Sequence, residues 1–222
     1  MTTVKKHDFV EIDYTGIING DNTIFDTTEE KVAKENNLYN KNADYSPAII
    51  CIGEANILQG FDDQIIGKEV GKEYRFEIDA ENAFGRKDAK LIQLIPISKF
   101  KQQNIQPFPG LQLNIDGVFG IVKTVSGGRC LVDFNHPLAG KDLIYNVKIN
   151  KIIEDNKEKL KSLLRIHLNI KEADIEIKDD AANIKLKQKL PNQTQEELKN
   201  IVKKTIPIIK DINFVIIEEE NK

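Results

Sequence analysis

Residues 10–28 read VEIDYTGIINGDNTIFDTT. From residue 8 to residue 18, apolar and polar side chains alternate with a period of two, which is typical of a half-buried strand. Asn19 and Gly20 then have the composition of a tight turn, and TIFDTT resumes an extended pattern. The stretch therefore predicts two consecutive strands joined by a turn.

The composition describes an ordinary globular protein. The chain has 222 residues, of which 40% are hydrophobic and 30% are charged, and its formal net charge is -3. This length allows one large domain or two or three small ones. The charge argues against a generalised phosphate-binding surface, so we expect no nucleic-acid partner.

The length of the apolar runs and the spacing of the cysteines indicate where in the cell the protein is expected. No run approaches the ~18 apolar residues needed to span a bilayer, and the first residues carry no signal-peptide pattern. We therefore expect no membrane partner and a cytoplasmic protein. Cys51 and Cys130 are far apart in the sequence, and in this context two reduced thiols are favoured over a disulfide.

Changes of pattern along the chain predict three domains. A polar stretch with a short helix, a buried strand at 48–53, a helix near 62–66 and another strand lead to Gly85. Residues 86–135 then read as a β-meander with turns at 116–117 and 127–128. A long strand follows, and from residue 154 the pattern is αββαβ, with a cap signal at Thr194 and Glu197 for the second helix.

The first segment resembles a known family through several motifs in order. YTG and FD followed by two threonines lie in the opening stretch, and IGEANILQGFDDQIIGKEVGKEYRFEI and ENAFG follow at compatible spacing. This order is similar to that of FKBP-type peptidyl-prolyl cis/trans isomerases, over residues 1–85 and 136–153. The resemblance implies an α+β fold in which an antiparallel half-barrel sheet surrounds a short helix.

The region after ENAFG narrows the resemblance to a subclass. About 50 residues intervene before the chain returns through FNHPLAG at 134–140. This resembles SlyD-like members, in which a small all-β domain is inserted in the flap. The expected parts are an isomerase domain at 1–85 and 136–153, an inserted domain at 86–135 and a C-terminal α+β domain at 154–222, the last resembling the long archaeal members.

The resemblance implies a function with two parts. The first is cis/trans isomerisation of Xaa-Pro bonds in unfolded or nascent polypeptides, and the second is chaperone activity of the inserted domain. The alternative is a holdase or assembly chaperone that does not catalyse and keeps a vestigial pocket. We expect no cofactor, and a homodimer through the C-terminal domain is one further hypothesis.

The resemblance also assigns site residues. The catalytic group would be Asp26, Tyr14 and Phe61, with Asp26 as an electrostatic group and an anchor for Tyr14, not a general base. The substrate-binding residues would be Phe25, Ala48, Cys51, Ile57, Leu58, Phe84 and Tyr145. Many family members have Trp at the position of Phe61, Tyr at that of Phe84 and an aromatic residue at that of Ala48, so we expect a shallower pocket.

Other residues have simpler interpretations. Asp62 and Asp63 resemble an acid pair but open a helix, where carboxylates complement the helix dipole. Cys51 is favoured as a small apolar side chain over a nucleophile, because no His or Asn partner is linked to it by a motif. The three histidines lack metal-site spacing, so no metal site is expected. For His136, next to Pro137, we expect a corner that sets the angle between two domains.

Overall fold

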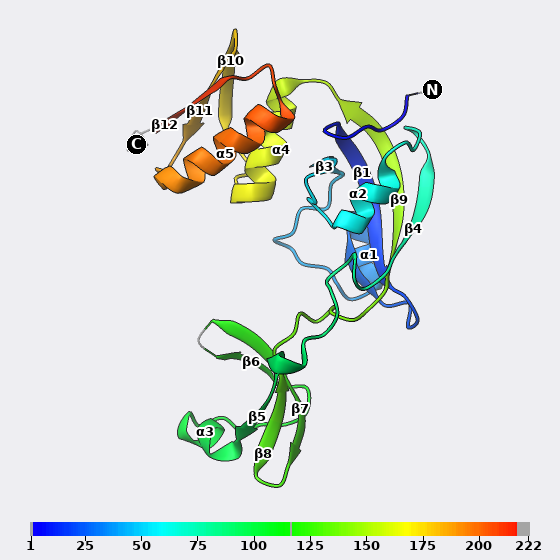
Figure 1. Cartoon of the computed structure of the whole chain (residues 1–222), viewed down its shortest axis with the longest axis vertical. Coiled ribbons are helices and arrows are strands. Elements are labelled where there is room, and N and C mark those ends of the chain that lie inside the picture. Colours follow the sequence, from blue (N-terminus) through cyan, green and yellow to red (C-terminus); the bar gives the residue numbers. More distant parts are fainter. Residues whose placement is uncertain (1, 116, 217–222) are drawn as a thin grey trace. The chain divides into compact units, whose positions relative to one another are not determined.

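The computed structural model describes residues 2–115 and 117–216 (Figure 1). The chain divides into two compact units, which are described separately. One unit is built from the residues up to Ile78 and from Ile144 onward, and the other from Asp79–Leu143. The division into three domains by residue number stays a prediction.

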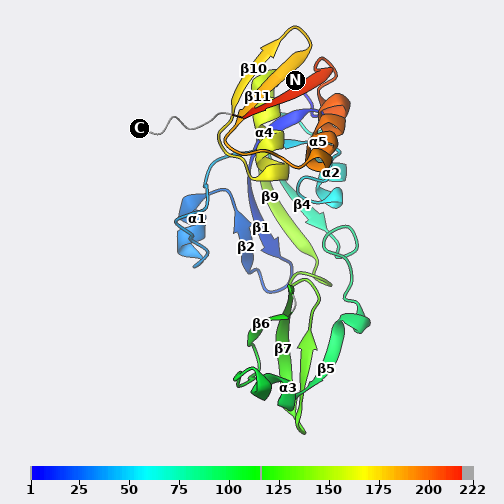
Figure 2. The same ribbon diagram turned by 90° about the vertical axis from the view of Figure 1, so that its left-hand side faces the viewer.

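The first unit contains a five-stranded antiparallel sheet. Its strands are β1 (Phe9–Ile18), β2 (Ile24–Thr27), β3 (Ala48–Cys51), β4 (Glu73–Ile78) and β9 (Leu143–Ile153). The order is β2-β1-β9-β4, and β3 pairs with β1 beyond the end of β2. The alternation in β1 places Phe9 and Ile12 fully inside, as the period of two requires. The sheet carries α1 (Glu30–Glu35) beside β2, as Figure 2 shows, and α2 (Gln59–Ile65).

The last part of the chain adds a second layer to this unit. It consists of α4 (Asn156–Leu168), β10 (Asp174–Lys178), β11 (Ala181–Leu186), α5 (Asn192–Thr205) and β12 (Asp211–Ile216). β10 and β11 form an antiparallel hairpin, and β12 runs parallel to β11 after the α5 crossover. Leu160, Leu163 and Leu164 of α4 lie in one core cluster with Phe9 of β1 and Cys51 of β3. The C-terminal part therefore shares a core with the first sheet.

The predicted start of α5 is wrong by three residues, because the cap lies at Pro191 and not at Thr194. The helix begins at Asn192, with Pro191 at the cap position and no side-chain cap. Proline is favoured just at a helix start, because its φ is already near the helical value and its missing N–H costs no hydrogen bond there. Thr194 therefore lies inside the first turn and does not cap the helix.

The second unit is a four-stranded antiparallel sheet with short helices. Its elements are η1 (Ala89–Leu91), β5 (Ile92–Pro96), α3 (Ile97–Gln102), β6 (Gln112–Ile115), β7 (Val118–Ser126) and β8 (Arg129–Asp133). The order is β5-β8-β7-β6. Gly127 and Gly128 both have positive φ and close the β7–β8 hairpin, as their sequence predicts. The predicted turn at 116–117 includes Asp116, which lies outside the described residues.

The predicted fold class is confirmed: an antiparallel sheet with a short helix, an inserted β unit and a C-terminal α+β part. Among the helices that the structure describes, none is long and apolar enough to cross a membrane.

Candidate active site

Tyr14 and Asp26 come together across the β1–β2 pair. The Tyr14 hydroxyl donates a hydrogen bond of 2.8 Å to Asp26 Oδ2. Burial, and then the negative charge and hydrogen bond of Asp26, raise the pKa of Tyr14 far above its usual range. Tyr14 therefore keeps its proton at all physiological pH values. The pair places a fixed carboxylate and a fixed hydroxyl at the surface of the sheet.

A cluster of aromatic rings lies directly behind this pair. Tyr145 on β9 contacts three rings, with centroid distances of 5.8 Å to Tyr14, 5.8 Å to Phe25 and 5.5 Å to Phe61. Phe61 also meets Phe76 edge to face at 5.3 Å. These tilted and edge-to-face geometries are the ones that aromatic quadrupoles favour. Phe61 is fully buried and Tyr145 is 2% exposed, whereas Tyr14 and Phe25 are half-buried and line a cavity.

The loop between β3 and α2 is held by two polar side chains. Asp62 Oδ2 accepts the backbone N–H groups of Gly53 at 3.0 Å and Ala55 at 2.8 Å, and Asn56 Oδ1 accepts the N–H of Cys51 at 2.7 Å. Gly53 and Ala55 both have positive φ, so the turn is tight and needs these anchors.

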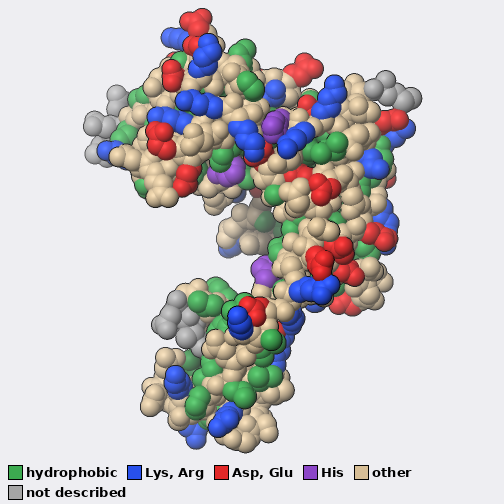
Figure 3. Space-filling view, in the orientation of Figure 1, with side chains coloured by type: hydrophobic (Ala, Val, Ile, Leu, Met, Phe, Trp, Pro, Cys, Tyr) green, Lys and Arg blue, Asp and Glu red, His purple; other side chains and the backbone are tan. Residues whose placement is uncertain are grey.

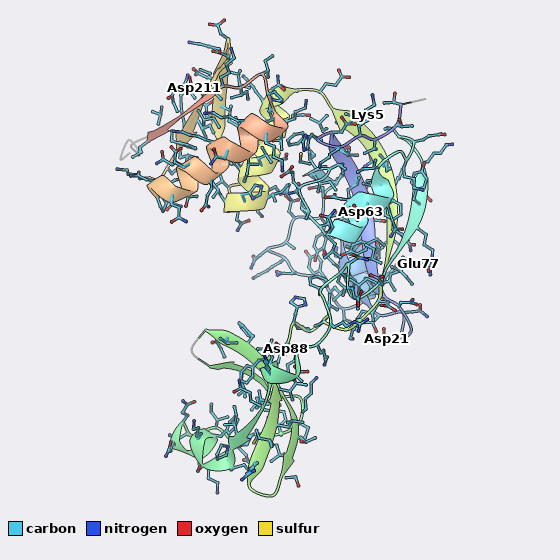
Figure 4. All side chains as sticks on the ribbon, viewed as in Figure 1. Lys5, Asp21, Asp63, Glu77, Asp88 and Asp211 are labelled. Atoms are coloured by element: carbon cyan, nitrogen blue, oxygen red, sulfur yellow. The ribbon has the colours of Figure 1, made fainter. Side chains whose placement is uncertain are left out.

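Asp62 and its neighbour Asp63 differ in burial and in the hydrogen bonds that they accept. Asp62 is 1% exposed, and burial raises the pKa of its carboxyl although two N–H groups oppose that rise. Asp63, labelled in Figure 4, is exposed on α2 and accepts one hydrogen bond from the Gln59 side chain. The two acids are therefore not a catalytic pair, and Asp62 is the anchor of the loop.

The same loop leaves one backbone donor free next to the aromatic cluster. The Leu58 carbonyl accepts from Phe61 and Asp62 at the start of α2. The Leu58 N–H has no acceptor within residues 2–115 and 117–216. Leu58 is 8% exposed, so this N–H is a buried donor without a partner in the described part of the chain.

The predicted site residues are distributed between a shared surface and other places. Tyr14, Phe25, Asp26 and Ala48 line one cavity, and Ile57 lines an adjacent cavity together with Tyr14 and Ala48. The remaining members lie elsewhere: Phe61, Leu58 and Tyr145 are buried behind the surface, Cys51 is fully buried in the core shared with α4, and Phe84 belongs to the second unit.

The comparisons with known proteins agree with this geometry. A family model described as FKBP-type peptidyl-prolyl cis-trans isomerase matches residues 1–102, and one described as FKBP26, IF domain matches residues 93–138. The short-type peptidyl-prolyl cis-trans isomerase of Methanocaldococcus jannaschii is 35% identical over 149 residues, which are 67% of this chain and 94% of that protein. The chain belongs to the FKBP-type peptidyl-prolyl cis-trans isomerases.

More distant bacterial FKBP-type proteins match a smaller part of the chain. The 16 kDa isomerase of Escherichia coli is 28% identical over 110 residues, covering 48% of this chain and 74% of that protein. SlyD of Helicobacter pylori is 25% identical over 123 residues, covering 54% of this chain and 66% of that protein. The SlyD-like resemblance and the inserted unit are thus both supported within the FKBP family.

Thr27 and Thr28, which follow Asp26, stabilise the backbone at this site of the FKBP domain. The site residues predicted from the sequence did not include them. The Thr28 hydroxyl accepts the Tyr14 N–H at 2.9 Å, and the Thr28 N–H donates to the Tyr14 carbonyl at 3.0 Å. Thr27 and Thr15 face each other with hydroxyls 3.0 Å apart. The sequence feature that could have indicated this role is the pair of threonines directly after Phe25 and Asp26. These contacts fix the backbone from which the ring of Tyr14 projects.

Gly16 is a second positioning residue that the YTG motif contains. A Cβ added to Gly16 would lie 2.6 Å from the tip of the Phe25 ring. Atoms cannot approach so closely, so any side chain at residue 16 would push this ring away from the cavity. The glycine is therefore needed for the position of Phe25.

Cys51 is unsuited to nucleophilic chemistry in this FKBP. Burial raises the pKa of its thiol to about 12, and the neighbouring carboxylates of Glu54 and Asp62 add to the rise. A thiol that keeps its proton is a poor nucleophile. Within the described residues, no group of three or more His, Cys, Asp or Glu side chains is arranged to hold a metal ion.

In the second unit, Phe84 and His136 stack on each other. Their ring centroids are 4.2 Å apart with an interplanar angle of 6°, and His136 Nδ1 accepts the Leu138 N–H at 3.2 Å. The Gly140 N–H donates to the Gly85 carbonyl at 2.7 Å. His136 thus stabilises the turn that contains Leu138, and its ring contact with Phe84 connects the segment that enters the second unit to the segment that leaves it. Its expected effect on the angle between domains stays a prediction.

Asp133 also connects the segment that enters the second unit to the segment that leaves it. Its carboxylate accepts from Lys87 Nζ at 2.7 Å and from the backbone and side-chain N–H groups of Asn135. Burial alone would raise the pKa of Asp133, but the hydrogen bonds from Lys87 and Asn135 outweigh it and lower the pKa to about 2. Asp88, labelled in Figure 4, completes the connection through its backbone to Asn135.

Proposed function

We propose that this FKBP catalyses cis/trans isomerisation of Xaa-Pro bonds in unfolded or partly folded proteins, and that its inserted unit holds these clients. The observation that carries the catalytic part is the Tyr14–Asp26 hydrogen bond of 2.8 Å at the edge of a buried aromatic cluster. Isomerisation needs no nucleophile, metal or proton transfer, so a site of this composition is sufficient for it.

The chemistry follows from the electronic structure of the prolyl amide. Rotation is slow because resonance gives the C–N bond a barrier of ~18–20 kcal/mol. The twisted amide has lost that resonance and is less polar, so an apolar and water-poor surface favours it over the planar form. Lowering the barrier by ~4 kcal/mol would accelerate rotation about a thousandfold.

The residues of the site have separate parts in this mechanism. Tyr14 and Phe25 offer the apolar surface against which the proline ring packs, with Tyr145 and Phe61 making that surface rigid from behind. The Asp26 carboxylate, held by Tyr14, lies beside the carbonyl that rotates. The free Leu58 N–H holds a second peptide carbonyl, so that one part of the client is fixed while the other turns.

The chaperone part is supported by the apolar surface of the inserted unit. Figure 3 shows hydrophobic side chains gathered there, and Leu94 and Phe119 are 62% and 68% exposed. A cavity of about 430 Å³ lies between β5, α3 and β6, with Leu94, Ile95 and Phe100 among its lining residues. Because β5 and β6 are the outer strands of their sheet, an extended client can also pair with an edge.

The alternative is a holdase without catalysis, and one observation favours it. Phe61 and Tyr145 are almost completely buried, and Ala48 is small, so the aromatic surface open to a proline comes from the half-buried Tyr14 and Phe25. A site of this kind would bind proline without turning it efficiently.

One pair of assays separates the two functions. The variant Leu94→Gln/Phe119→Gln should lose most suppression of the aggregation of an unfolded client while isomerising short Xaa-Pro peptides at the parent rate. The matched control Ile66→Gln/Ile208→Gln alters side chains that are 43% and 58% exposed in the other unit, and it should keep both activities. Full suppression by the first variant would remove the role of the inserted unit, and absence of peptide isomerisation by the parent would leave only the holdase.

Location and assembly complete the proposal. Cys51 and Cys130 are buried free thiols, as suits a reducing cytoplasm. A homodimer would form along β12, an outer strand of its sheet on which Val215 and Ile216 are 45% and 50% exposed. Sedimentation equilibrium at high protein concentration tests the dimer, and a monomer under these conditions would remove it.

A further inference from the structure

The surface around Tyr14 continues beyond the isomerase sheet onto α4. The first cavity has a volume of about 310 Å³ and is lined by Tyr14, Phe25, Asp26 and Ala48. A second cavity of about 530 Å³ is lined by Tyr14, Ala48 and Ile57 on one side and by residues of α4 on the other. Tyr14, Ala48 and Arg165 line both cavities, so the two are adjoining parts of one surface.

The position of α4 in this surface is fixed by packing and by an ion pair. Leu160, Leu163 and Leu164 are completely buried in the core that α4 shares with β1 and β3. On the outer side of the helix, Arg165 Nη2 lies 2.9 Å from Asp44 Oδ2, in the loop that leads into β3. The helix therefore forms a wall of the second cavity whose position is fixed.

The charge of this wall is mainly positive. Lys161, Arg165 and Lys171 line the second cavity, and Glu158 is the one acidic residue among its lining residues. Arg165 is engaged with Asp44. Lys161 and Lys171 are exposed and have no ion pair within the described residues. Two cations without an ion pair in the described part of the chain thus line the cavity next to Tyr14, and Lys161 also interacts at longer range with the carboxylate of Asp174.

We propose that the second cavity binds the client residues next to the prolyl bond, and that Lys161 and Lys171 select acidic side chains there. This inference rests on the proposed isomerase function, because the occupant is a client that is held at Tyr14 and Asp26. An extended chain advances about 3.3–3.6 Å per residue, so the residues nearest to the proline are the ones that reach α4. The C-terminal part thereby acts as a specificity element for the reaction.

The expected selectivity is modest because both lysines are exposed. Pairs between exposed charges are weakened by solvent and by salt. We expect about threefold to tenfold discrimination between acidic and basic flanking residues at low ionic strength, decreasing as salt is added. A change in binding of the client would appear mainly in KM, since the groups lie beside the rotating bond and do not touch it.

The test uses three peptides with the same Xaa-Pro bond and with Glu, Gln or Lys at the neighbouring positions, placed before the bond in one series and after it in another. The parent should process the Glu peptide about three to ten times more efficiently than the Lys peptide in one series. Lys161→Glu/Lys171→Glu should abolish or reverse this preference, measured as the ratio of the efficiencies with the Glu and the Lys peptide for each protein. The control Lys189→Glu/Lys203→Glu makes the same change of net charge at exposed lysines outside the cavity and should retain the preference.

Two results would overturn the inference: no preference for Glu in either series of the parent, or a preference that survives in Lys161→Glu/Lys171→Glu. Binding of the same peptides, followed by fluorescence anisotropy, separates this inference from the proposed function. If the parent binds the Glu peptide through Lys161 and Lys171 but does not isomerise it, the selectivity stands and the isomerase proposal falls.

Discussion

In the unit that contains Tyr14 and Asp26, the large rings of Phe61 and Phe76 are at most 2% exposed and pack against each other. In the inserted unit, Phe119 is 68% exposed and Leu94 is 62% exposed, and its buried core has few members. The first arrangement fixes a small surface in one geometry, as a catalytic site requires. The second leaves apolar surface open, as binding of varied clients requires. The same residue types thus form a rigid core in one unit and stay exposed in the other, where we propose that they hold clients.

The largest expected effect comes from truncating one ring in each unit. Phe61→Ala should lower the free energy of unfolding by about 3–5 kcal/mol, because it removes a buried ring and leaves a cavity beside Tyr145 and Phe76. Phe119→Ala should change it by less than about 0.5 kcal/mol, because the ring is already in solvent. Denaturant unfolding followed by near-ultraviolet circular dichroism measures both. Equal losses would contradict the contrast between the two units.

The next effect concerns the two adjacent acids on α2. Asp62→Ala should cost about 2–3 kcal/mol, because the N–H groups of Gly53 and Ala55 lose a charged acceptor inside the protein. It should also lower kcat/KM, since the loop that carries Ile57 and Leu58 would shift. Asp63→Ala is the matched control and should stay within about 0.5 kcal/mol of the parent. A similar cost for both variants would show that Asp62 does not anchor the loop.

The smallest expected effect concerns stability at acidic pH, where the two units should respond in opposite directions. The pKa of Asp133 is lowered to about 2 in the folded inserted unit, so its stabilising contribution is complete above the ordinary carboxyl pKa near ~4 and is lost as pH falls to about 2. The pKa of Asp62 is raised by burial, so the sign is opposite: this carboxyl favours the folded state increasingly as pH falls through its raised pKa.

Hydrogen exchange between pH 5 and pH 2 resolves these contributions by unit. Asp133→Asn should flatten the loss of protection in the inserted unit over this range, with little change in the other unit. An unaltered pH profile in Asp133→Asn would remove the role assigned to that carboxylate.

Much of this architecture could be predicted from the sequence because it depends on local pattern. The alternation from residue 8 to residue 18 became β1, and Gly127-Gly128 became a hairpin turn with positive φ. These features require only the period of a strand and the freedom of glycine. The motif order also led to the Tyr14–Asp26 pair, whose hydrogen bond the structure contains.

Contacts between distant segments could not be predicted in the same way. Cys51 was expected to contribute to the pocket, and the structure places it in the core with α4, because a strand pattern does not say what covers each face. The role of Asp62 was also missed as a loop anchor, since its acceptor geometry depends on positive φ at Gly53 and Ala55. Arg165 lies in a segment far along the chain from Asp44, and no motif connects the two.

Magnetisation exchange between the cis and trans forms of a short Xaa-Pro peptide measures whether the surface of Tyr14 and Asp26 turns the prolyl bond. Catalytic amounts of the parent protein should accelerate this exchange, Asp26→Ala should reduce the acceleration by about tenfold or more, and Leu94→Gln/Phe119→Gln should leave it intact. If the parent does not accelerate exchange, or if Asp26→Ala accelerates it equally well, this surface is not the site of isomerisation.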